Sequence, residues 1–477
     1  MRVCLISGEY PPMQGGVGDY THELGKALAA LDVEVAVITS ARAASQVAVG
    51  QAQGLPPGGA EQDGGRRARP TASHDGLEVY PIIPHWGWGS WGRIAALVQQ
   101  WGADIVHVQY QAAAYGMHPA ANLLPWRLRQ GGHKAQGGHK AQGDHKAQGG
   151  HKGRPYVVTT FHDLKVPYLF PKAGPLRWWA MLALMRWSDA TILTNEEDYA
   201  RVKSIEQRAK SKASSMLYAL CPMLYALYPM LYALSPMLYL IPIGSNIAVA
   251  PPPDYERAVW RARLGVGAGE TLLAYFGFLN ESKGGETLIR ALDELVRSCQ
   301  PVRLLMVGGQ VGDSDPTNVD YLAKVKNLIA DLGLSERVLW TGFSSAAAVS
   351  AHLLAADIGV LPYRDGASFR RGSFMALLAH GLPIVSTVPP GAGDALSLDS
   401  GLPRLQDGEN VRLVPPDDPA ALAQAVIELA ASPEARQRLA AEARTLAAAF
   451  AWESIAKQHL EVYQTLLAAK TAGTPPP

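Results

Sequence analysis

The chain has 477 residues, 48% of them hydrophobic and 18% charged, which is typical of a globular protein long enough for two domains. Its formal net charge is +1, from 43 basic and 42 acidic residues, so no global field draws it to nucleic acid or to an anionic membrane. We therefore expect no nucleic-acid partner.

The three cysteines, Cys4, Cys221 and Cys299, lie far apart in the sequence. They form neither a disulfide framework nor a metal cluster, which favours a reducing cytoplasmic location. The chain opens with Met-Arg-Val-Cys-Leu-Ile-Ser, which is typical of a first β-strand and lacks the longer apolar core and cleavage site of a signal peptide.

Strand and helix patterns alternate along the chain, which predicts parallel sheets covered by helices. In the first half, the spacing of apolar residues predicts a helix over Asp19–Leu31. The strands expected in this half are Met1–Ser7, Val33–Thr39, Asp104–Val108, Tyr156–Thr160 and Ala190–Thr194.

A proline-rich stretch near Ile241–Pro253 is a natural linker, and a second series of strands follows it. Two doubly wound α/β domains facing a cleft follow from this pattern, with the boundary placed between residues 245 and 246. The strands expected in the second domain are Thr271–Phe276, Val302–Val307, Val338–Thr341, Ile358–Leu361 and Pro383–Ser386.

Three segments of low complexity do not fit a compact domain: residues 41–76, 132–153 and 214–237. The second repeats Gly-His-Lys-Ala-Gln-Gly and is read as a disordered insertion, with a metal site or a nucleic-acid tail as the alternative. The third repeats Met-Leu-Tyr-Ala-Leu-x-Pro, and its uncharged length satisfies a transmembrane criterion. Its regularly spaced prolines would interrupt a helix, so we expect an insertion, with contact at a membrane surface as the alternative.

Two loops that follow strands are candidates for ligand binding in the first domain. Gly15 and Gly16 lie between the first strand and the first helix, where glycine lets the backbone come close to a ligand; a tight turn is the alternative. His162 follows the strand at Tyr156–Thr160, and its imidazole can hydrogen-bond a sugar or a phosphate; a capping or core histidine is the alternative.

The second domain offers cationic side chains at loop–helix junctions. Lys283 lies at such a junction after a strand, and Arg370 and Arg371 stand where a short helix begins, with Gly372 and Ser373 just behind. A helix N-terminus offers free N–H groups and partial positive charge, and arginine adds paired donors, so this stretch suits a phosphate group. Solvated surface cations are the alternative. Asp313 and Asp315 have the spacing of a metal-binding pair, but their surroundings are loop-like and no metal is expected.

In their order, these residues resemble the retaining glycosyltransferases of family 4, which have the GT-B fold, and the resemblance covers nearly the whole chain apart from the insertions. It implies a C-terminal nucleotide-binding domain at residues 246–448, a helix at 449–470 that crosses back to the N-terminal domain, and a disordered tail at 471–477. Its markers are Gly15–Gly18, Asp104–Gln109, His162, Ile241–Gly244, Lys283-Gly284, Val307–Gly309, Thr341–Phe343, Ala379–Pro383, Gly408–Pro416 and Phe450–Ala456.

The chain departs from the family pattern at three positions. Two glutamates eight positions apart are usual before the Ala-x-Gly-x-Pro turn, and Ser368 and Ala376 stand in their places. Phe278 replaces the usual arginine that precedes the lysine motif. Arg370 and Arg371 are expected to compensate for the lost charge, and Asp365 is expected to stand in for the missing acid.

The resemblance implies transfer of a sugar from a UDP- or GDP-linked donor to a glycan, lipid or small-molecule acceptor, with retention of anomeric configuration, as in polysaccharide biosynthesis. No metal is needed if protein groups stabilise the departing diphosphate. The expected catalytic residues are His162, Lys283, Asp365, Arg370 and Arg371. The expected substrate-binding residues are Gly15, Gly16, Val17, Asn280, Gly342, Phe343, Gly372 and Ser373.

Alternatives to a transferase stay open at this point. Without the two glutamates, the chain can be a sugar-nucleotide binder that has lost turnover, and GT-B-like folds also serve sugar-nucleotide epimerases. Trp86, Trp88 and Trp91 can stack on a sugar, meet a lipid interface or form a packed loop. The expected partners are a nucleotide-sugar donor and a glycan or lipid-linked acceptor, with peripheral contact at the inner membrane face as a further expectation. The donor base, sugar and acceptor are not specified.

Overall fold

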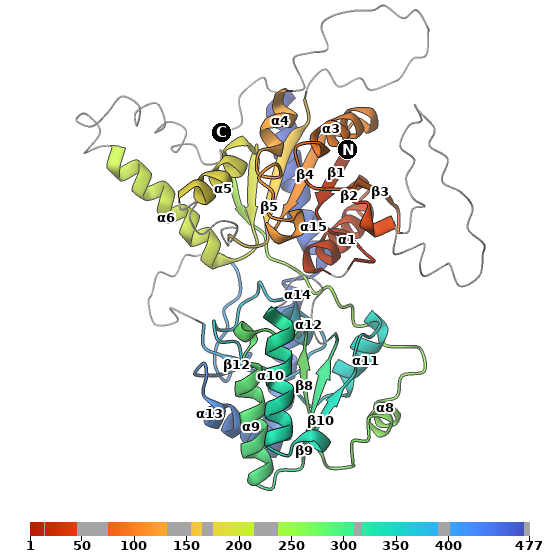
Figure 1. Cartoon of the computed structure of the whole chain (residues 1–477), viewed down its shortest axis with the longest axis vertical. Helices are drawn as coiled ribbons and strands as arrows, with labels where there is room; N and C mark the ends of the chain where they lie inside the picture. Colours follow the sequence, from red (N-terminus) through yellow and green to blue (C-terminus); the bar gives the residue numbers. More distant parts are fainter. Residues whose placement is uncertain are drawn as a thin grey trace, which may run out of the picture. The chain divides into compact units, whose positions relative to one another are not determined.

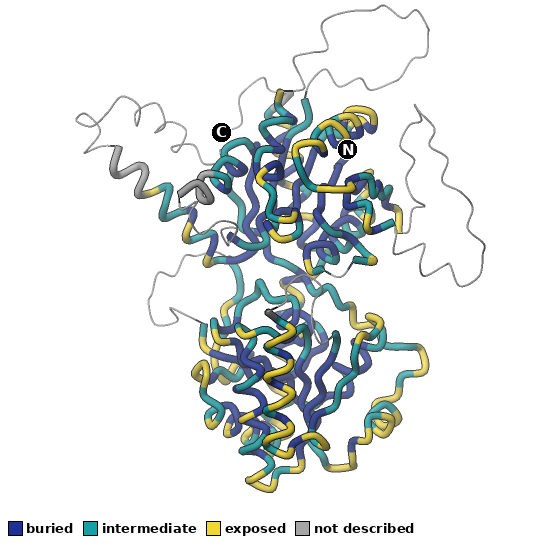
Figure 2. The backbone as a smooth tube through the Cα atoms, in the orientation of Figure 1, coloured by how far each residue is buried: buried dark blue, intermediate teal, exposed yellow. Residues whose placement is uncertain are grey.

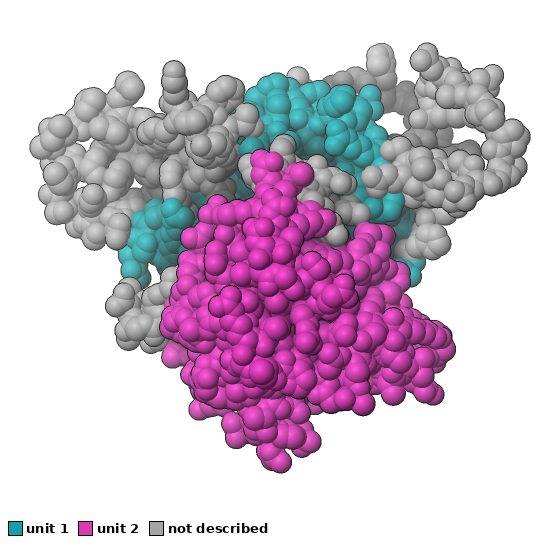
Figure 3. Space-filling view, turned by 60° about the horizontal axis from the view of Figure 1, so that its bottom comes forward, with its two compact units in different colours: residues 1–242, 452–477 teal, residues 243–451 magenta. Residues whose placement is uncertain are grey.

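The computed structural model describes residues 1–13, 15–44, 75–130, 154–164, 175–213, 237–309, 317–389 and 401–471. The chain divides into two compact units (Figure 3): unit 1 comprises Met1–Pro242 with Trp452–Pro477, and unit 2 comprises Ile243–Ala451. Both repeat insertions, nearly all of residues 41–76 and the Asp313–Asp315 pair lie outside the described residues.

Unit 1 contains one parallel sheet with the strand order β3-β2-β1-β4-β5-β6-β7. The order reverses between β1 and β4, so the connections leave these two neighbouring strands in opposite directions. The strands are β1 (Arg2–Ser7), β2 (Glu34–Ser40), β3 (Leu77–Ile83), β4 (Ile105–Tyr110), β5 (Tyr156–Phe161), β6 (Ala190–Leu193) and β7 (Leu238–Leu240). Two of them, β3 and β7, are absent from the strands expected from sequence.

The helices of unit 1 pack around this sheet (Figure 1). They are α1 (Gly16–Ala29), α3 (Ser90–Trp101), η1 (Ala113–Tyr115), α4 (Leu124–Gln130), α5 (Pro175–Trp187), α6 (Glu196–Ala213) and α15 (Trp452–Thr471). The first helix begins at Gly16 rather than at Asp19, so the sequence-based start is wrong by three residues. The physical reason is that the Glu9 carboxylate accepts hydrogen bonds from the amides of Val17 and Gly18, which start the helix early.

Unit 2 repeats the same architecture with the strand order β10-β9-β8-β11-β12-β13, all parallel. The reversal of order lies between β8 and β11. The strands are β8 (Thr271–Phe276), β9 (Val302–Val307), β10 (Val338–Trp340), β11 (Ile358–Leu361), β12 (Ile384–Thr387) and β13 (Arg412–Val414). The helices are α8 (Arg257–Arg263), η4 (Glu281–Lys283), α9 (Gly285–Arg297), α10 (Thr317–Asp331), η5 (Ser335–Arg337), α11 (Ala346–Ala355), α12 (Gly372–Ala379), α13 (Pro419–Ala431) and α14 (Pro433–Ala448).

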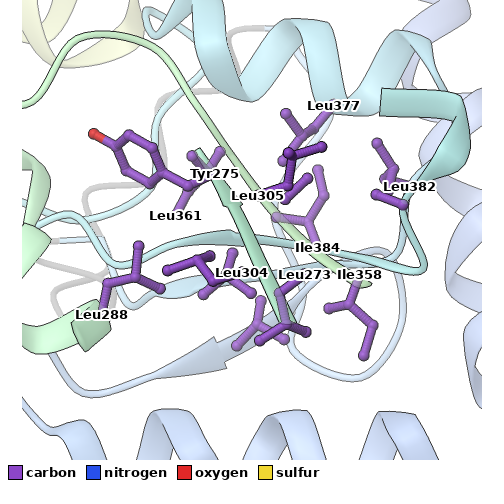
Figure 4. Close-up of a cluster of buried hydrophobic side chains, with 14 of the residues drawn as sticks. Leu273, Tyr275, Leu288, Leu304, Leu305, Ile358, Leu361, Leu377, Leu382 and Ile384 are labelled. Atoms are coloured by element: carbon purple, nitrogen blue, oxygen red, sulfur yellow. The ribbon is translucent and has the colours of Figure 1, made fainter. Parts of the chain in front are cut away.

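The central strands are buried on both faces because helices cover both sides of each sheet (Figure 2). In unit 2 the aliphatic side chains of the strands gather around β8, as Figure 4 shows for Leu273, Leu304 and Ile384. Continuous runs such as Leu272–Tyr275 therefore become central strands rather than half-exposed ones. Two buried parallel sheets with a Rossmann-like strand order confirm the expected α/β fold class.

A buried polar network joins α15 to the sheet of unit 1. The hydroxyl of Tyr463 lies 2.6 Å from Nδ1 of His107, whose Nε2 lies 2.7 Å from the Thr160 hydroxyl. One turn away, Nε2 of His459 lies 3.4 Å from the hydroxyl of Tyr20 on α1. Burial lowers the pKa of His459 to about 4 and holds that of His107 well below its ordinary value.

These histidines predict a loss of stability in mild acid. The histidines of an unfolded chain titrate near pH 6.5, so below that pH the unfolded state binds more protons, and the free energy of unfolding falls as the pH drops from about 6.5 towards 4. Each such histidine contributes up to about 1.4 kcal/mol per pH unit in this window. Urea denaturation at several pH values should show that the free energy of unfolding falls less in acid for His459→Gln than for wild type. The exposed His85→Gln variant is the control, and an equal loss in His459→Gln and wild type contradicts the prediction.

Candidate functional site

The candidate site lies where the strand order of unit 2 reverses, at the carboxyl ends of β8 and β11. Open α/β sheets bind ligands at such a point because the two neighbouring loops diverge there. One loop runs from Gly277 to Lys283 after β8, and the other runs from Tyr363 to Arg371 after β11 and leads into α12. These loops carry most of the site residues expected in the second domain.

Lys283 is the uncompensated cation of this site. Its Nζ lies 3.1 Å from the point that a Cβ on Gly277 would occupy, so the side chain turns back over the end of β8. Among the described residues, Nζ has neither a hydrogen-bond nor an ion-pair partner. Burial and the neighbouring Arg371 lower the pKa of Lys283 to about 8. The ammonium is therefore mostly charged at pH 7 and lacks the anion that would stabilise it.

The two arginines of the β11 loop share a single carboxylate. Nη2 of Arg370 lies 3.2 Å from Oδ2 of Asp365, and Nη2 of Arg371 pairs with Oδ1 of the same residue. The Arg371 guanidinium also lies 4.3 Å from the ring centroid of Tyr363. Its Nε is buried and has no partner among the described residues. Asp365 thus neutralises one of the two charges and fixes both guanidinium groups.

The N-terminus of α12 completes the site. The helix begins at Gly372 without a side-chain cap, so its first amides have no capping oxygen. The Ser373 hydroxyl lies 2.7 Å from the Tyr363 hydroxyl. The Cβ of Ser373 lies 3.6 Å from the point that a Cβ on Gly277 would occupy. The structure therefore brings the start of α12 together with Lys283 and the arginine pair, as the sequence predicts for a phosphate site.

The positions that lack the family glutamates carry no acid in the structure. Ala376 is fully buried inside α12, and the Ser368 hydroxyl accepts a hydrogen bond of 3.4 Å from the Arg370 amide. Phe278 packs its ring against Gly309, 3.0 Å from the Cβ position of that glycine. Since Phe278 replaces the usual arginine of the β8 loop, the cation that accompanies Lys283 is Arg371 of the β11 loop.

The remaining residues expected in unit 2 line the neighbouring strand ends. Asn280 accepts a hydrogen bond of 2.9 Å from the Ser282 hydroxyl. Gly342 adopts φ +65°, which favours glycine, and bridges to Gly308 at the ends of β9 and β10. Phe343 follows with 76% of its surface exposed. This exposed aromatic ring after β10 offers a surface on which a flat base can stack.

In the glycine loop of unit 1, the space beside Gly15 is filled by a side chain of the chain itself. A side chain on Gly15 would overlap the Glu9 carboxylate, which accepts hydrogen bonds from Val17 (3.1 Å) and Gly18 (3.4 Å). Burial raises the pKa of Glu9, and burial together with Glu9 raises that of Asp19 to about 6. The close approach expected at Gly15 is thus made by Glu9, whereas a Cβ on Gly16 would meet nothing within 4 Å.

His162 lies at the end of β5 and is neutral. Its Nε2 lies 3.0 Å from Oε1 of Gln109, and its ring meets the Tyr20 ring edge to face at 4.6 Å. Burial lowers the pKa of His162 to about 3. At neutral pH its ring can therefore donate or accept a hydrogen bond, but it carries no positive charge that would attract a phosphate.

A cavity of about 440 Å³ lies at the opposite end of the unit 2 sheet from Lys283. It is lined by Asp357 and Pro383, which precede β11 and β12. Two of the arginines that line it donate to carbonyl groups at helix ends: Arg257 to Leu354 and Arg436 to Leu429. These cations stabilise helix ends, so the reversal point remains the better candidate site.

Two family models match the chain. The Glycosyl transferase 4-like domain matches residues 15–206, and the Glycosyl transferases group 1 model matches residues 270–432, which contain the Lys283–Arg371 site. The chain belongs to the group 1 glycosyltransferases. This confirms the resemblance to the family 4 glycosyltransferases, while retention of anomeric configuration stays a prediction. No helix in the described ranges is long and apolar enough to cross a membrane. Nor does any cluster of three or more His, Cys, Asp or Glu suited to a metal occur among those residues.

Curated relatives match about half of the chain. It is 32% identical over 242 residues to a D-inositol 3-phosphate glycosyltransferase of Kineococcus radiotolerans, covering 49% of this chain and 53% of that protein. It is 29% identical to a phosphatidyl-myo-inositol mannosyltransferase of Mycobacterium leprae, covering 42% and 47%. The chain thus spans about half the length of the curated relatives that it matches.

Solved structures match nearly the whole chain. Sucrose-phosphate synthase from Thermosynechococcus elongatus superimposes with a TM-score of 0.63 at 21% identity and covers 98% of this chain and 100% of its own. The Anabaena protein HepE, solved with UDP and glucose, gives 0.60 at 18% identity with the same coverage. These structures confirm the GT-B fold.

The lowered pKa of Lys283 predicts how the site binds an anion as pH changes. Inorganic pyrophosphate should bind more weakly as the pH rises from 7 to 9, because Lys283 loses its proton near pH 8, with a fall of up to about tenfold per pH unit. Calorimetry on wild type and Lys283→Met separates this effect from the titration of pyrophosphate itself. Lys324→Met, which alters an exposed lysine on α10, is the control. The same pH profile in Lys283→Met and wild type contradicts the assignment.

Proposed function

We propose that the chain is a glycosyltransferase that moves a sugar from a nucleotide-diphosphate sugar to an acceptor, with retention of anomeric configuration. The observation that carries this proposal is the uncompensated Lys283 beside Arg371 and the uncapped start of α12. Membership of the group 1 glycosyltransferases supports it. The proposed donor nucleotide is UDP or GDP.

The proposed role of this cluster is to stabilise the leaving diphosphate. When the bond between the anomeric carbon and the phosphate oxygen breaks, negative charge grows on the diphosphate and positive charge grows on the sugar. Lys283 and Arg371 offer cations, and Gly372 and Ser373 offer amides, at one point of the sheet. Such fixed donors lower the activation barrier by several kcal/mol. The loss of one donor typically slows the reaction on the order of a hundredfold.

These groups support a reaction without a divalent metal, because the protein itself supplies the charge that a metal would bring to the diphosphate. In this proposal Asp365 is a positioning residue. It fixes Arg370 and Arg371 through its two oxygens. Each guanidinium therefore loses less conformational entropy when the donor binds. Phe343 is proposed as the surface for the base, and Asn280, beside Lys283, as a contact of the sugar phosphate.

The proposed acceptor site is in unit 1. The proposed contacts there are His162, which offers a neutral hydrogen-bonding ring, and the loop with Gly15, Gly16 and Val17. Two curated relatives are named for inositol phosphate and phosphatidyl-myo-inositol, which supports a polyol, glycan or lipid-linked acceptor. A lipid-linked acceptor would require peripheral contact with a membrane, and the few, dispersed cysteines support a cytoplasmic location.

A second candidate function is a sugar-nucleotide binder without turnover. It is supported by the absence of a carboxylate at Ser368 and Ala376. Such a protein would bind the donor through Lys283 and Arg371 but would release neither nucleotide nor sugar. A GT-B-like epimerase, in turn, would change the sugar nucleotide without any acceptor.

The donor site is tested by calorimetry with UDP and GDP in the absence of metal. One of them should bind to wild type, and Lys283→Ala should weaken that binding about 10- to 100-fold, because each charged hydrogen bond contributes about 1.5–3 kcal/mol. Arg371→Gln should act in the same direction. The matched control is Lys324→Ala, which should bind as wild type does. Absence of binding to either nucleotide contradicts the proposed function.

Turnover separates the three activities. Wild type should release the nucleotide from the matching sugar donor when acceptors are supplied, and NMR of the product should show the anomeric configuration of the donor. Tight binding without release supports the inactive binder. A changed sugar nucleotide in the absence of acceptor identifies an epimerase.

A further inference from the structure

Three tryptophans of the segment Trp86–Trp91 form an ordered aromatic group on unit 1. Trp86 and Trp91 are partly buried, and their ring N–H groups donate to backbone carbonyls at Gly8 (3.2 Å) and Ala120 (3.0 Å). Trp88 lies between them in the sequence, with glycine on either side, and half of its surface is exposed. Trp86 and Trp91 are thus fixed by backbone hydrogen bonds, and Trp88 between them faces solvent.

The exposed ring is held by its neighbours rather than free to rotate. Trp88 meets the Trp91 ring at 4.9 Å with an interplanar angle of 86° and the His118 ring at 5.4 Å with an angle of 77°. Such edge-to-face pairs stabilise one orientation of each ring. Trp91 is in turn 6.1 Å from Trp126 on α4. A ring that is already fixed loses little conformational entropy when a ligand binds to it.

This aromatic group adjoins the point where the strand order of unit 1 reverses. Gly8, which accepts the Trp86 hydrogen bond, directly follows β1. The Trp86 ring also meets Tyr115 at 4.7 Å, and the Tyr115 hydroxyl donates to the carbonyl of Ile6 in β1 (2.9 Å) and lies 3.0 Å from that of Gln109 in β4. Trp86 is therefore tied to both strands that flank the ligand-binding end of this sheet, two residues before Trp88 in the sequence.

We propose that Trp88 is a stacking surface for a saturated ring of the acceptor, either a pyranose or a cyclitol. The axial C–H groups on one face of such a ring carry partial positive charge and are attracted to the negative face of an indole. The hydroxyl groups at the rim need polar partners, and the exposed His85 and the half-buried His118 lie beside the tryptophans. This inference rests on the proposed transferase function and locates its acceptor.

The surroundings of Trp88 favour a sugar over a lipid surface. Trp88 is the one exposed large hydrophobic side chain among the described residues of unit 1. The other exposed large hydrophobic side chains of the described residues belong to unit 2. A single ring among polar groups matches one saturated ring, whereas attachment to a bilayer needs a wider apolar face. The nearest cation on the following helix, Arg93, donates to the carbonyl of Ile82.

The test measures binding of small ring compounds to the full chain. Saturation-transfer difference NMR with methyl α-D-mannopyranoside, methyl α-D-glucopyranoside and myo-inositol should show transfer to at least one of them in wild type. Trp88→Ala should reduce that signal about fivefold or more, and Trp88→Phe should retain part of it because a flat ring remains. Val249→Ala, which shortens an exposed side chain of unit 2, is the matched control.

Each outcome has one meaning. Circular dichroism checks that each variant folds. If Trp88→Ala does not fold, Trp88→Phe and Trp88→Tyr are compared with wild type instead. If UDP or GDP binds but no ring compound depends on Trp88, this inference is overturned while the proposed function stands. If neither nucleotide binds, the proposed function fails first. If phosphatidylglycerol vesicles sediment wild type but not Trp88→Ala, Trp88 serves a lipid surface and the sugar proposal is overturned.

Discussion

The reversal of strand order within a buried parallel sheet is the constraint on which both halves of the protein depend. A parallel sheet needs helices on both faces, and a chain that starts in the middle of the sheet must send its later connections to the other face. Two loops then diverge from adjacent strand ends. In unit 2 those loops carry Lys283 and Arg371, and in unit 1 the equivalent position is tied to Trp86 through Gly8.

The two units manage charge at their reversal points in different ways. In unit 1 the chain supplies its own anion, because Glu9 accepts the first amides of α1. In unit 2 a single carboxylate, Asp365, serves two arginines, and the ammonium of Lys283 is left without a counter-charge among the described residues. The first amides of α1 are therefore paired with a carboxylate of the chain itself, while the β8–β11 end of the other sheet retains net positive charge for a ligand.

The strands that the sequence patterns missed all lie at the edge of a sheet, although one edge strand, β10 (Val338–Trp340), was predicted. β3, β7 and β13 each end a sheet; β3 and β13 contain Glu78, Pro81 and Arg412, which weaken a continuous apolar pattern, and β7 is only three residues long. The cationic cluster was predictable because its members stand at loop–helix junctions. Its pairing with Asp365, and the contact of Glu9 with α1, were not, since a sequence does not show which charged groups in a loop meet.

The position of α15 has a consequence for the order in which the protein can form during synthesis. This helix belongs to unit 1 but follows unit 2 along the chain, so unit 2 is an insertion within unit 1. While a ribosome makes residues 243–451, the surface of α1 and β4 that α15 covers has no partner, and His107 lacks Tyr463. Unit 2 can complete its core first, whereas unit 1 must wait with apolar surface open to chaperones or to other chains.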